Sequence, residues 1–200
     1  RYAKFTELII FFENTDNKIL KKVGLSILDN SYVPKLIRSV IASSILVGHK
    51  LQMPIEFVTQ KIALDSLVGR QLTEGRQHVI RYNCVHTPVI WDKHGMTHDY
   101  SLFYPDEIGF RNGSCRPYNS FDLTMRKELQ LMQNSTAIAE FSLLDPRYNN
   151  YSLTDALNIC KTVIKNVRKF EGELVILYHT HQTTGKNWQF YNRLINLVLR

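Results

Sequence analysis

This sequence of 200 residues lacks the features that mark several specialised classes of protein. No apolar run approaches the roughly 18 residues that a membrane-spanning helix needs, and there is no repeat, low-complexity tract or linker. The three cysteines, Cys84, Cys115 and Cys160, are odd in number and far apart, so they suggest neither a disulfide framework nor a zinc knuckle. We therefore expect one domain over residues 1–200, without a membrane span, in the reducing environment of the cytoplasm.

The charge balance is strongly positive, at +7 with a pI near 9.3. Such a balance can indicate an anionic partner, including nucleic acid. The basic residues are scattered, however, and one of the densest groups lies on a predicted helix at spacings that leave it facing water: Lys161, Lys165, Arg168 and Lys169. We expect a solvated face and no nucleic-acid partner. The alternative is a nucleic-acid-binding module, which predicts steeply salt-dependent binding.

Apolar spacing divides most of the chain into alternating strands and helices. Strands are predicted at the short apolar runs: Leu8–Phe12, His78–Tyr82, Tyr100–Tyr104, Thr136–Leu144 and Leu174–Tyr178. Helices are predicted at Tyr32–Val47, at Ile55–Leu72, from Thr87 to Gly95, after the capping residue Ser152, and at Trp188–Leu199. This alternation predicts an α/β fold with βαβ units and a mostly parallel sheet. In such folds the chemistry lies at the carboxyl ends of the strands.

Polar groups at the ends of two predicted strands and inside a third are expected to converge on one rim of the sheet, and Asp106 and Arg111 follow the first of these strands, Tyr100–Tyr104. His179 follows the apolar run Leu174–Tyr178, and Glu140 lies inside the apolar segment Thr136–Leu144, where an unpaired carboxylate would be costly. His179 is placed to act as a metal ligand, a general acid or base, or an oxyanion partner. The alternative is a histidine that only hydrogen-bonds at the rim of the sheet.

The segment Tyr104–Tyr118 is rich in glycine and follows a strand-like run. Gly109 and Gly113 allow a tight, non-repeating backbone that can aim the side chain of Arg111. The guanidinium of Arg111 suits bidentate pairing with a carboxylate or phosphate, and it is also suited to orienting a catalytic acid. The alternative is a salt bridge to Asp106 or its neighbour that only shapes the loop.

A series of short motifs occurs in order along the chain: Gly75-Arg-Gln-His78, Thr87-Pro88, His98-Asp-Tyr-Ser-Leu102, Gly109-Phe-Arg-Asn-Gly-Ser-Cys-Arg-Pro-Tyr118, Ala139-Glu140 and Leu177-Tyr-His179. This series resembles the polysaccharide deacetylase-like proteins of the glycoside hydrolase/deacetylase (NodB-type) barrel superfamily. The resemblance is to the branch found in bacterial surface-polysaccharide gene clusters, and it covers roughly Ile10–Leu197.

The resemblance implies a distorted (β/α) barrel and the hydrolysis of an N- or O-acetyl group on a carbohydrate substrate. It also implies Zn²⁺ or another divalent metal, which would polarise the acetyl carbonyl and activate water. In the catalytic set, Arg111 would orient the catalytic aspartate, His179 would protonate the leaving group, and Glu140 stands where the family has Asp. The residues implied for substrate binding are Asp106, Arg116, Pro117 and Tyr118. The residue implied as a metal ligand is His78.

Two departures from the family pattern favour a second function class. The early strand that carries the catalytic aspartates would precede Leu8, where no Asp occurs, so we expect an incomplete barrel without its first strand. In the segment Gly48–Pro54, Pro54 stands in place of a metal-binding His, and Lys50 in place of a Glu. A site that has lost two of about three zinc ligands should not hold the metal tightly. The alternative is a catalytically impaired, metal-free protein that binds a carbohydrate or assists assembly.

The missing strand would also affect the state of the protein in solution. It would leave Leu8–Phe12 as an unpaired strand at the edge of the sheet. Exposed edges invite pairing with other chains. We therefore expect self-association through this edge.

Overall fold

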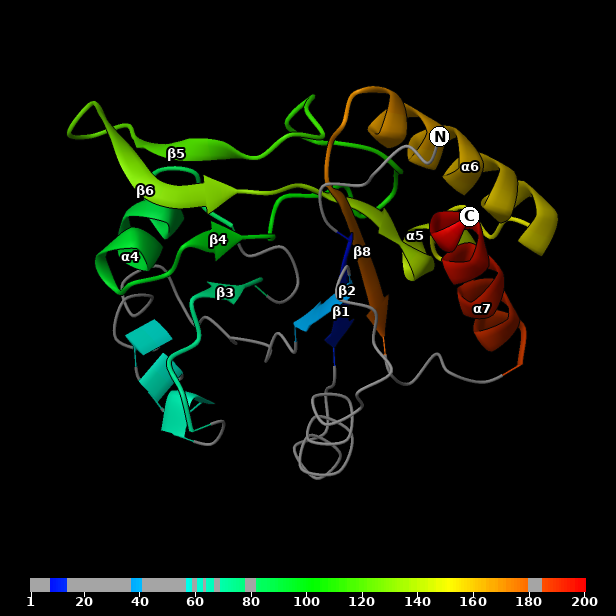
Figure 1. Ribbon diagram of the computed structural model, residues 1–200, viewed down its shortest axis with the longest axis horizontal. Helices are drawn as coiled ribbons and strands as arrows, with labels where there is room; N and C mark the ends of the chain where they lie inside the picture. Colours follow the sequence, from blue (N-terminus) through cyan, green and yellow to red (C-terminus); the bar gives the residue numbers. More distant parts are fainter. Residues whose placement is uncertain are drawn as a thin grey trace.

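The computed structural model describes residues 8–13, 37–40, 57–58, 61–62, 64–66, 69–77, 82–179 and 185–200. These residues form a mixed α/β structure, in which two four-stranded sheets are accompanied by helices (Figure 1). The predicted α/β class with mostly parallel strands is confirmed. The described strands form two separate sheets and do not close into a barrel.

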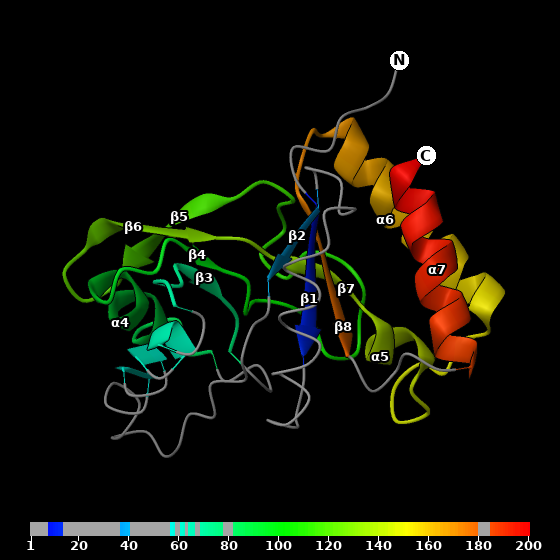
Figure 2. The same cartoon turned by 60° about the horizontal axis from the view of Figure 1, so that its bottom comes forward.

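The first sheet is entirely parallel and has the strand order β2-β1-β8-β7. Its strands are β1 (Leu8–Glu13), β2 (Ile37–Val40), β7 (Thr136–Ala139) and β8 (Leu174–His179). β1 lies alongside β8 (Figure 2), from Leu8 opposite Leu174 to Glu13 opposite His179, and it pairs with β2 on its other side. The predicted strand Leu8–Phe12 is confirmed, but the prediction that it is an unpaired edge is wrong. The expected self-association through that edge therefore loses its basis.

The second sheet has the strand order β3-β4-β6-β5. Its strands are β3 (Glu74–Gly75), β4 (His98–Asp99), β5 (Tyr118–Asp122) and β6 (Lys127–Gln133). β3, β4 and β6 are parallel, whereas β5 and β6 form an antiparallel hairpin. Two residues connect β6 to β7, and here the amides of Asn134 and Thr136 donate to the carbonyls of Asp99 and Leu102 at 2.9 and 3.1 Å. Backbone hydrogen bonds therefore join the two sheets.

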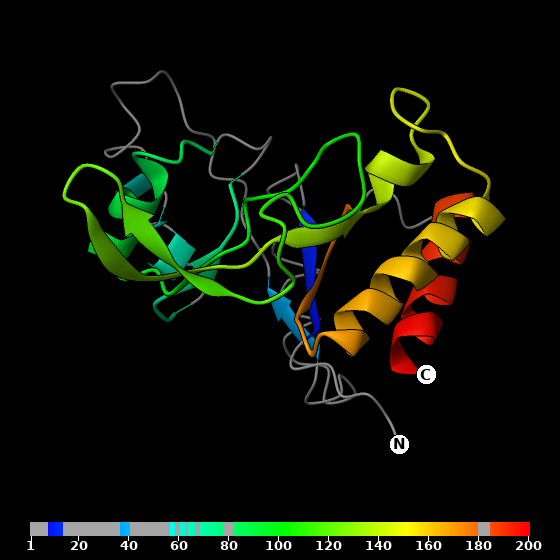
Figure 3. The same cartoon turned by 90° about the horizontal axis from the view of Figure 1, so that it is seen from above.

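Helices flank both sheets. They are α4 (Thr87–Lys93), α5 (Glu140–Leu144), α6 (Leu153–Lys169) and α7 (Gly185–Leu199). α6 and α7 lie side by side next to the first sheet, and α4 lies against the hairpin of the second sheet (Figure 3). Among the described residues, no helix has the length and apolar character needed to cross a membrane.

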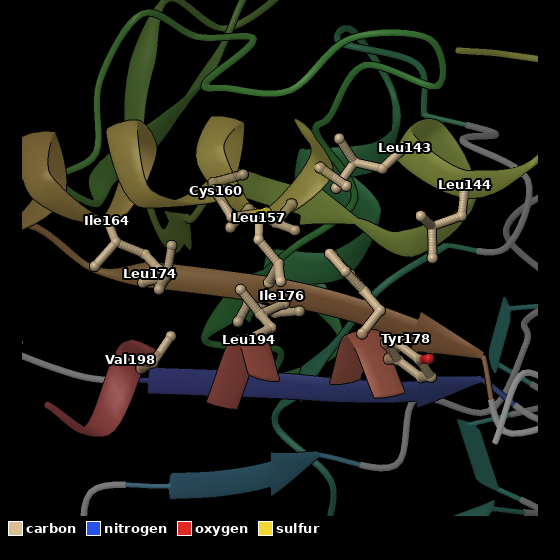
Figure 4. Close-up of a cluster of buried hydrophobic side chains, with 14 of the residues drawn as sticks. Leu143, Leu144, Leu157, Cys160, Ile164, Leu174, Ile176, Tyr178, Leu194 and Val198 are labelled. Carbon is tan, nitrogen blue, oxygen red and sulfur yellow. The ribbon is translucent and has the colours of Figure 1, made fainter. Parts of the chain in front are cut away.

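Strand β8 is buried on both faces. Successive side chains of a strand point to opposite faces, and on one face of β8 they meet α5, α6 and α7 (Figure 4). The labelled members of this cluster are Leu143, Leu144, Leu157, Cys160, Ile164, Leu174, Ile176, Tyr178, Leu194 and Val198. On the opposite face, Val175 and Leu177 pack against Tyr100, Phe103 and Ala139. The prediction of a fully buried strand is confirmed, since a continuous apolar run is what a strand covered on both faces requires.

Both ends of α6 are determined by specific residues. At the start, the hydroxyl of Ser152 accepts a hydrogen bond from the amide of Asp155 at 3.1 Å, which confirms the predicted cap. At the end, Glu171 adopts a left-handed conformation with φ of 51°. Gly172 follows in close contact with Cys115, because an added Cβ would lie 2.7 Å from the Cys115 carbonyl oxygen. Gly172 is therefore required by the close approach of two backbone segments.

Two predictions of element type are wrong where the structure describes the chain. Within the predicted helix Tyr32–Val47, residues 37–40 form strand β2, since pairing with β1 overrides the helical spacing. Within the predicted strand Thr136–Leu144, β7 ends at Ala139 and α5 begins at Glu140. The short helix is held by its surroundings, because the hydroxyl of Ser142 donates to the carbonyl of Pro105 at 2.8 Å.

Other predicted elements differ in extent. Tyr100–Tyr104 forms no strand of its own, although the Tyr100 amide donates to the Gly75 carbonyl at 2.9 Å. No strand is predicted after the glycine-rich segment Tyr104–Tyr118, where the structure has β5, so the hairpin of the second sheet was not predicted. The short helix after Thr87 and the carboxyl-terminal helix are confirmed as α4 and α7. Of the predicted strand His78–Tyr82, residues 78–81 lie outside the described residues.

Candidate functional site

Glu140 and His179 form the centre of the candidate site. The Nδ1 of His179 contacts the Oε1 of Glu140, and the backbone amide of His179 donates to the same oxygen at 3.1 Å. The side chain of Glu140 is 2% exposed and that of His179 is 15% exposed. A buried carboxylate thus holds a histidine whose ring reaches solvent at one edge.

Strand geometry explains why these two residues meet. β7 and β8 are parallel neighbours, and Glu140 and His179 both stand at the carboxyl ends of these strands. Along β8, alternation places His179 on the same face as Val175 and Leu177, which is the face opposite α6 and α7. The predicted convergence of polar groups at one end of the sheet is therefore confirmed for this pair.

Arg76 brings a buried positive charge close to the pair. It follows β3 directly, is 2% exposed, and its Cζ lies 5.2 Å from the centre of the Phe103 ring. Burial lowers the pKa of the Arg76 guanidinium to about 10, and the carboxylates of Glu140 and then Asp99 oppose this effect. Arg76 is therefore positively charged at neutral pH and interacts with both acids.

Asp99 is the second buried acid near Arg76. Its side chain is fully buried at the end of β4, and its Oδ1 accepts a hydrogen bond from the Ser101 amide at 2.7 Å. The Ser101 hydroxyl in turn accepts from the Gln77 amide at 2.8 Å. Burial raises the pKa of Asp99 to about 6, more strongly than the Ser101 hydrogen bonds and the charge of Arg76 lower it. These contacts tie the carboxyl ends of β3 and β4 together.

Aromatic rings form the apolar side of the site. The ring of Phe141 lies edge-on to the His179 ring, with centres 5.4 Å apart, and it also contacts Phe103 and Tyr148 at 6.0 and 5.4 Å. Tyr148 is 40% exposed. A buried carboxylate and an aromatic ring therefore both contact the histidine, and the aromatic ring leads to the partly exposed ring of Tyr148.

Arg111, a predicted catalytic residue, lies outside this inner group. Its side chain is exposed, its Nη1 donates to the Phe103 carbonyl at 3.3 Å, and its Cζ lies 5.9 Å from the centre of the Tyr104 ring. Within the described part of the chain, Arg111 makes no hydrogen bond or ion pair with Glu140 or His179. Among the described residues, Phe103 and Phe141 link Arg111 to His179.

The loop that contains the other predicted residues runs between two ends of the sheet. Asp106 is exposed beside α5, where its carbonyl accepts from Asn149 at 2.7 Å. The side chain of Arg116 is exposed. It lies near the opposite end of β8, since its Nε donates to the Phe170 carbonyl at 3.0 Å and the carbonyl of Cys115 accepts from the Glu173 amide at 2.8 Å. A six-residue strand spans roughly 16 Å. The structure therefore does not bring Arg116 together with His179.

The two residues that follow Arg116 lead into the hairpin. Pro117 is partly buried and precedes β5, and Tyr118 is the first residue of that strand, opposite Gln133 of β6. The side chain of Tyr118 is 42% exposed. Neither residue contacts the Glu140–His179 pair within the described parts of the chain.

The described residues do not supply a zinc site. No group of three or more His, Cys, Asp or Glu side chains is arranged to hold a metal among them. The Oε1 of Glu140 and the Nδ1 of His179 are both atoms that can bind a metal, but here they contact each other. His78, the predicted metal ligand, lies outside the described residues, as do Lys50 and Pro54.

Sequence reasoning did not assign a role to Arg76 or Asp99. Both lie in the motifs that carry the family resemblance, Gly75-Arg-Gln-His78 and His98-Asp-Tyr-Ser-Leu102, so a signal was present. Arginine and aspartate side chains are mostly exposed in folded proteins. Their burial depends on the pairing of the short strands β3 and β4, which no local pattern predicts.

Comparisons with known proteins support the fold. No family model and no curated protein matches the chain. A crystal structure from Mycobacterium smegmatis, of a protein provisionally named a polysaccharide deacetylase, is similar with a TM-score of 0.65 and 14% sequence identity. The similarity covers 99% of this chain and 86% of that chain. The chain therefore has a polysaccharide deacetylase-like fold.

Proposed function

We propose that this protein acts on an acetylated sugar of a bacterial surface polysaccharide and hydrolyses its N- or O-acetyl group. The observation that carries the proposal is the contact between the buried Glu140 and the partly exposed His179 at the carboxyl ends of two parallel strands. Ligands of open α/β sheets bind at this end. The similarity in fold to a protein named as a deacetylase points to the same class of substrate.

In this proposal the oxygen of a water molecule adds to the acetyl carbonyl carbon while His179 takes a proton from that water. His179 then gives the proton to the departing sugar nitrogen or oxygen as its bond to the carbonyl carbon breaks, and acetate is released. The Glu140 carboxylate accepts a hydrogen bond from Nδ1, which fixes the orientation and tautomer of the ring and leaves proton transfer to Nε2. The imidazolium that forms during the reaction is stabilised by the same carboxylate. Glu140 thus takes the place that the resemblance gives to an aspartate.

The aromatic surface suits a sugar ring. The apolar face of a pyranose packs well on an aromatic ring, and Tyr148 offers a partly exposed ring beside Phe141. Arg111 is placed to bind a polar group of the sugar at the outer side, where its guanidinium faces solvent. Asp106 lies on the same side, next to α5.

Acetate release from N-acetylglucosamine oligomers and from an O-acetylated oligosaccharide tests the proposal. General acid–base groups contribute about 10²- to 10⁴-fold to a rate, so we expect His179→Gln and Glu140→Gln to lower kcat at least a hundredfold. Arg193→Gln, an exposed substitution on α7, is the matched control and should leave the rate unchanged. Release that is equally fast in His179→Gln would overturn the assignment.

A second candidate function is a metal-free protein that binds the carbohydrate without hydrolysing it. The sequence favours it, since Pro54 and Lys50 stand where the family pattern has a His and a Glu. Calorimetry with zinc separates the two candidates. Micromolar or tighter binding that is lost in His78→Ala and His179→Ala supports the hydrolase, whereas sugar binding without zinc binding or acetate release supports the second candidate.

A further inference from the structure

The carboxyl-terminal ends of α6 and α7 lie side by side, near the amino end of β8 (Figure 3). Arg168 joins the two helices, because its Nη2 donates to the carbonyls of Leu197 and Val198 at 3.3 and 2.9 Å. Arg116 lies beside them, since its Nε donates to the carbonyl of Phe170 at 3.0 Å. Hydrogen bonds to backbone carbonyls therefore gather three separate segments of the chain on one surface.

Positive charge predominates on this surface. It carries four exposed cations besides the half-buried Arg168: Arg116, Lys165, Lys169 and Arg200. The acids at the same end are Glu171 and Glu173, so five positive charges stand against two negative ones. α7 contains no acid, and the single acid of α6, Asp155, lies in the first turn at its other end. A surface of this sign attracts anions.

Two large apolar side chains are exposed among these cations. Phe170 is 53% exposed and Leu199 is 52% exposed. The backbone holds Phe170 in this position, because its amide donates to the Asn166 carbonyl at 3.0 Å and its carbonyl accepts from Arg116. The Nζ of Lys169 lies 5.1 Å from the centre of the Phe170 ring. Together with the five cations, Phe170 and Leu199 form the basic patch.

The apolar members of the basic patch distinguish between two kinds of anionic partner. Nucleic acid duplexes offer phosphates on a hydrated surface, and single strands offer bases that stack on aromatic rings. Neither provides an apolar surrounding for Leu199. An anionic bilayer offers phosphates above an apolar interior, which takes up aromatic and aliphatic side chains alike. Charge and apolar character together therefore favour the bilayer.

We propose that the basic patch docks this protein on the surface of a membrane that contains anionic phospholipids. The cations contact the lipid phosphates, while Phe170 and Leu199 enter the interfacial region of the bilayer. The patch lies at the amino end of β8, whereas His179 lies at its carboxyl end. Docking therefore leaves the candidate site uncovered, and it does not require the proposed function, because a different surface is involved.

Vesicle flotation with the full chain tests the docking. One set of vesicles contains phosphatidylcholine alone, and the other contains equal parts of phosphatidylcholine and phosphatidylglycerol. We expect the partition coefficient to be about tenfold or more higher on the anionic vesicles, and to fall as the salt concentration rises. Equal binding to both sets, or binding to neither, would overturn the proposal.

A double variant, Lys165→Gln with Lys169→Gln, tests the cations of the patch. Each cation near an anionic surface strengthens binding roughly fivefold, so this variant should bind roughly twentyfold more weakly. Lys93→Gln with Lys127→Gln removes two exposed cations beside the second sheet and should bind like the wild type. An equal loss in both double variants would overturn the proposal, because net charge and not the patch would then control binding.

Phe170→Ser tests insertion into the bilayer, because it keeps every charge. It should lower binding to the anionic vesicles about fivefold, since an aromatic side chain no longer leaves water. Phe121→Ser is the matched control, since Phe121 is 49% exposed on β5, and it should leave binding unchanged. Unchanged binding in Phe170→Ser, or tighter binding of the wild type to duplex DNA than to anionic vesicles, would overturn the proposal.

The membrane test and the test of the proposed function are independent. Vesicle binding needs no sugar, and acetate release from soluble oligosaccharides needs no vesicle. A protein that binds anionic vesicles without releasing acetate would reject the proposed function and support the docking. A protein that releases acetate but does not bind these vesicles would reject only the docking.

Discussion

Glu140 and His179 are 39 residues apart in the chain, yet the backbone amide and the ring of His179 both contact one oxygen of Glu140. Two donors on a single acceptor make the position of the His179 ring depend on one carboxylate. The same carboxylate interacts electrostatically with the guanidinium of Arg76. Glu140 therefore has a structural role that can be measured without a substrate.

Replacement of Glu140 by Ala should destabilise the fold. The variant leaves the His179 amide without its acceptor and removes one of the charges that compensate Arg76, and breaking a buried pair costs about 3–5 kcal/mol. Glu140→Gln keeps an acceptor oxygen and should cost less. Urea denaturation measures both, with the exposed Glu107→Gln as a control that should stay within about 0.5 kcal/mol of the wild type. Equal stability of the Ala variant and the wild type would contradict this prediction.

The stability of the protein should depend on the protonation of Asp99. Burial raises the pKa of this acid from 3.8 to about 6, so the folded state binds the proton more tightly than the unfolded state does. The resulting stabilisation is fully present below pH 4 and is lost as the pH rises through 6. It amounts to roughly 3 kcal/mol, at about 1.4 kcal/mol for each pH unit.

The variant Asp99→Asn is the reference for this measurement, because an asparagine side chain does not titrate. Between pH 4 and pH 7, the free energy of unfolding of the wild type should fall relative to this variant by roughly 2.4 kcal/mol. Urea denaturation of both proteins at four pH values gives the difference. A difference that stays constant over this range would show that burial of the carboxyl has no such effect.

Gly172 should tolerate no side chain. A Cβ at this position would lie 2.7 Å from both the Cβ and the carbonyl oxygen of Cys115, and still closer to its Sγ. Because a backbone carbonyl cannot move aside easily, Gly172→Ala should lower the free energy of unfolding by about 3 kcal/mol.

Gly113→Ala is the control for this substitution. Gly113 has a positive φ of 75° and open space around it, so its cost should be limited to about 1–2 kcal/mol of backbone strain. Thermal denaturation compares the two variants. A smaller loss in Gly172→Ala than in Gly113→Ala would mean that the contact with Cys115 is not tight.

The start of α6 should depend on the side chain of Ser152. Its hydroxyl accepts a hydrogen bond from the Asp155 amide at 3.1 Å, and loss of such a cap costs about 1 kcal/mol. Ser152→Ala should show this loss in denaturant unfolding. Thr162→Ala, an exposed substitution inside the same helix, should be neutral or slightly stabilising, since Ala favours helix more than Thr.

Several elements could be predicted because local sequence encodes them. The apolar run Leu174–Tyr178 requires burial on both faces, and β8 has it. Ser152 and the spacing of apolar residues after it predict α6. His179 and Glu140 were chosen as candidates because a polar group beside an apolar run needs a partner, and they prove to be each other's partner.

Other features were missed because their cause lies elsewhere in the chain. Residues 37–40 have helical spacing but pair with β1. The hairpin strand Tyr118–Asp122 contains Asn, Ser and Asp, which disfavour strands, and β6 holds it in place. The glycines on both sides of Arg111 predicted that its side chain points into a site, yet it lies at the solvent side of Phe103.

By itself the sequence determined the class of fold, the buried strand, the cap at the start of its long helix and two members of the candidate site. Only the tertiary structure decided which charges share that site. Arg76 follows β3 and Asp99 is the last residue of β4, and both strands have only two residues. Such short segments are placed by pairing with distant strands. The physical reason is that burial and charge compensation depend on neighbours in space, whereas spacing along the chain reports only which face of an element is apolar.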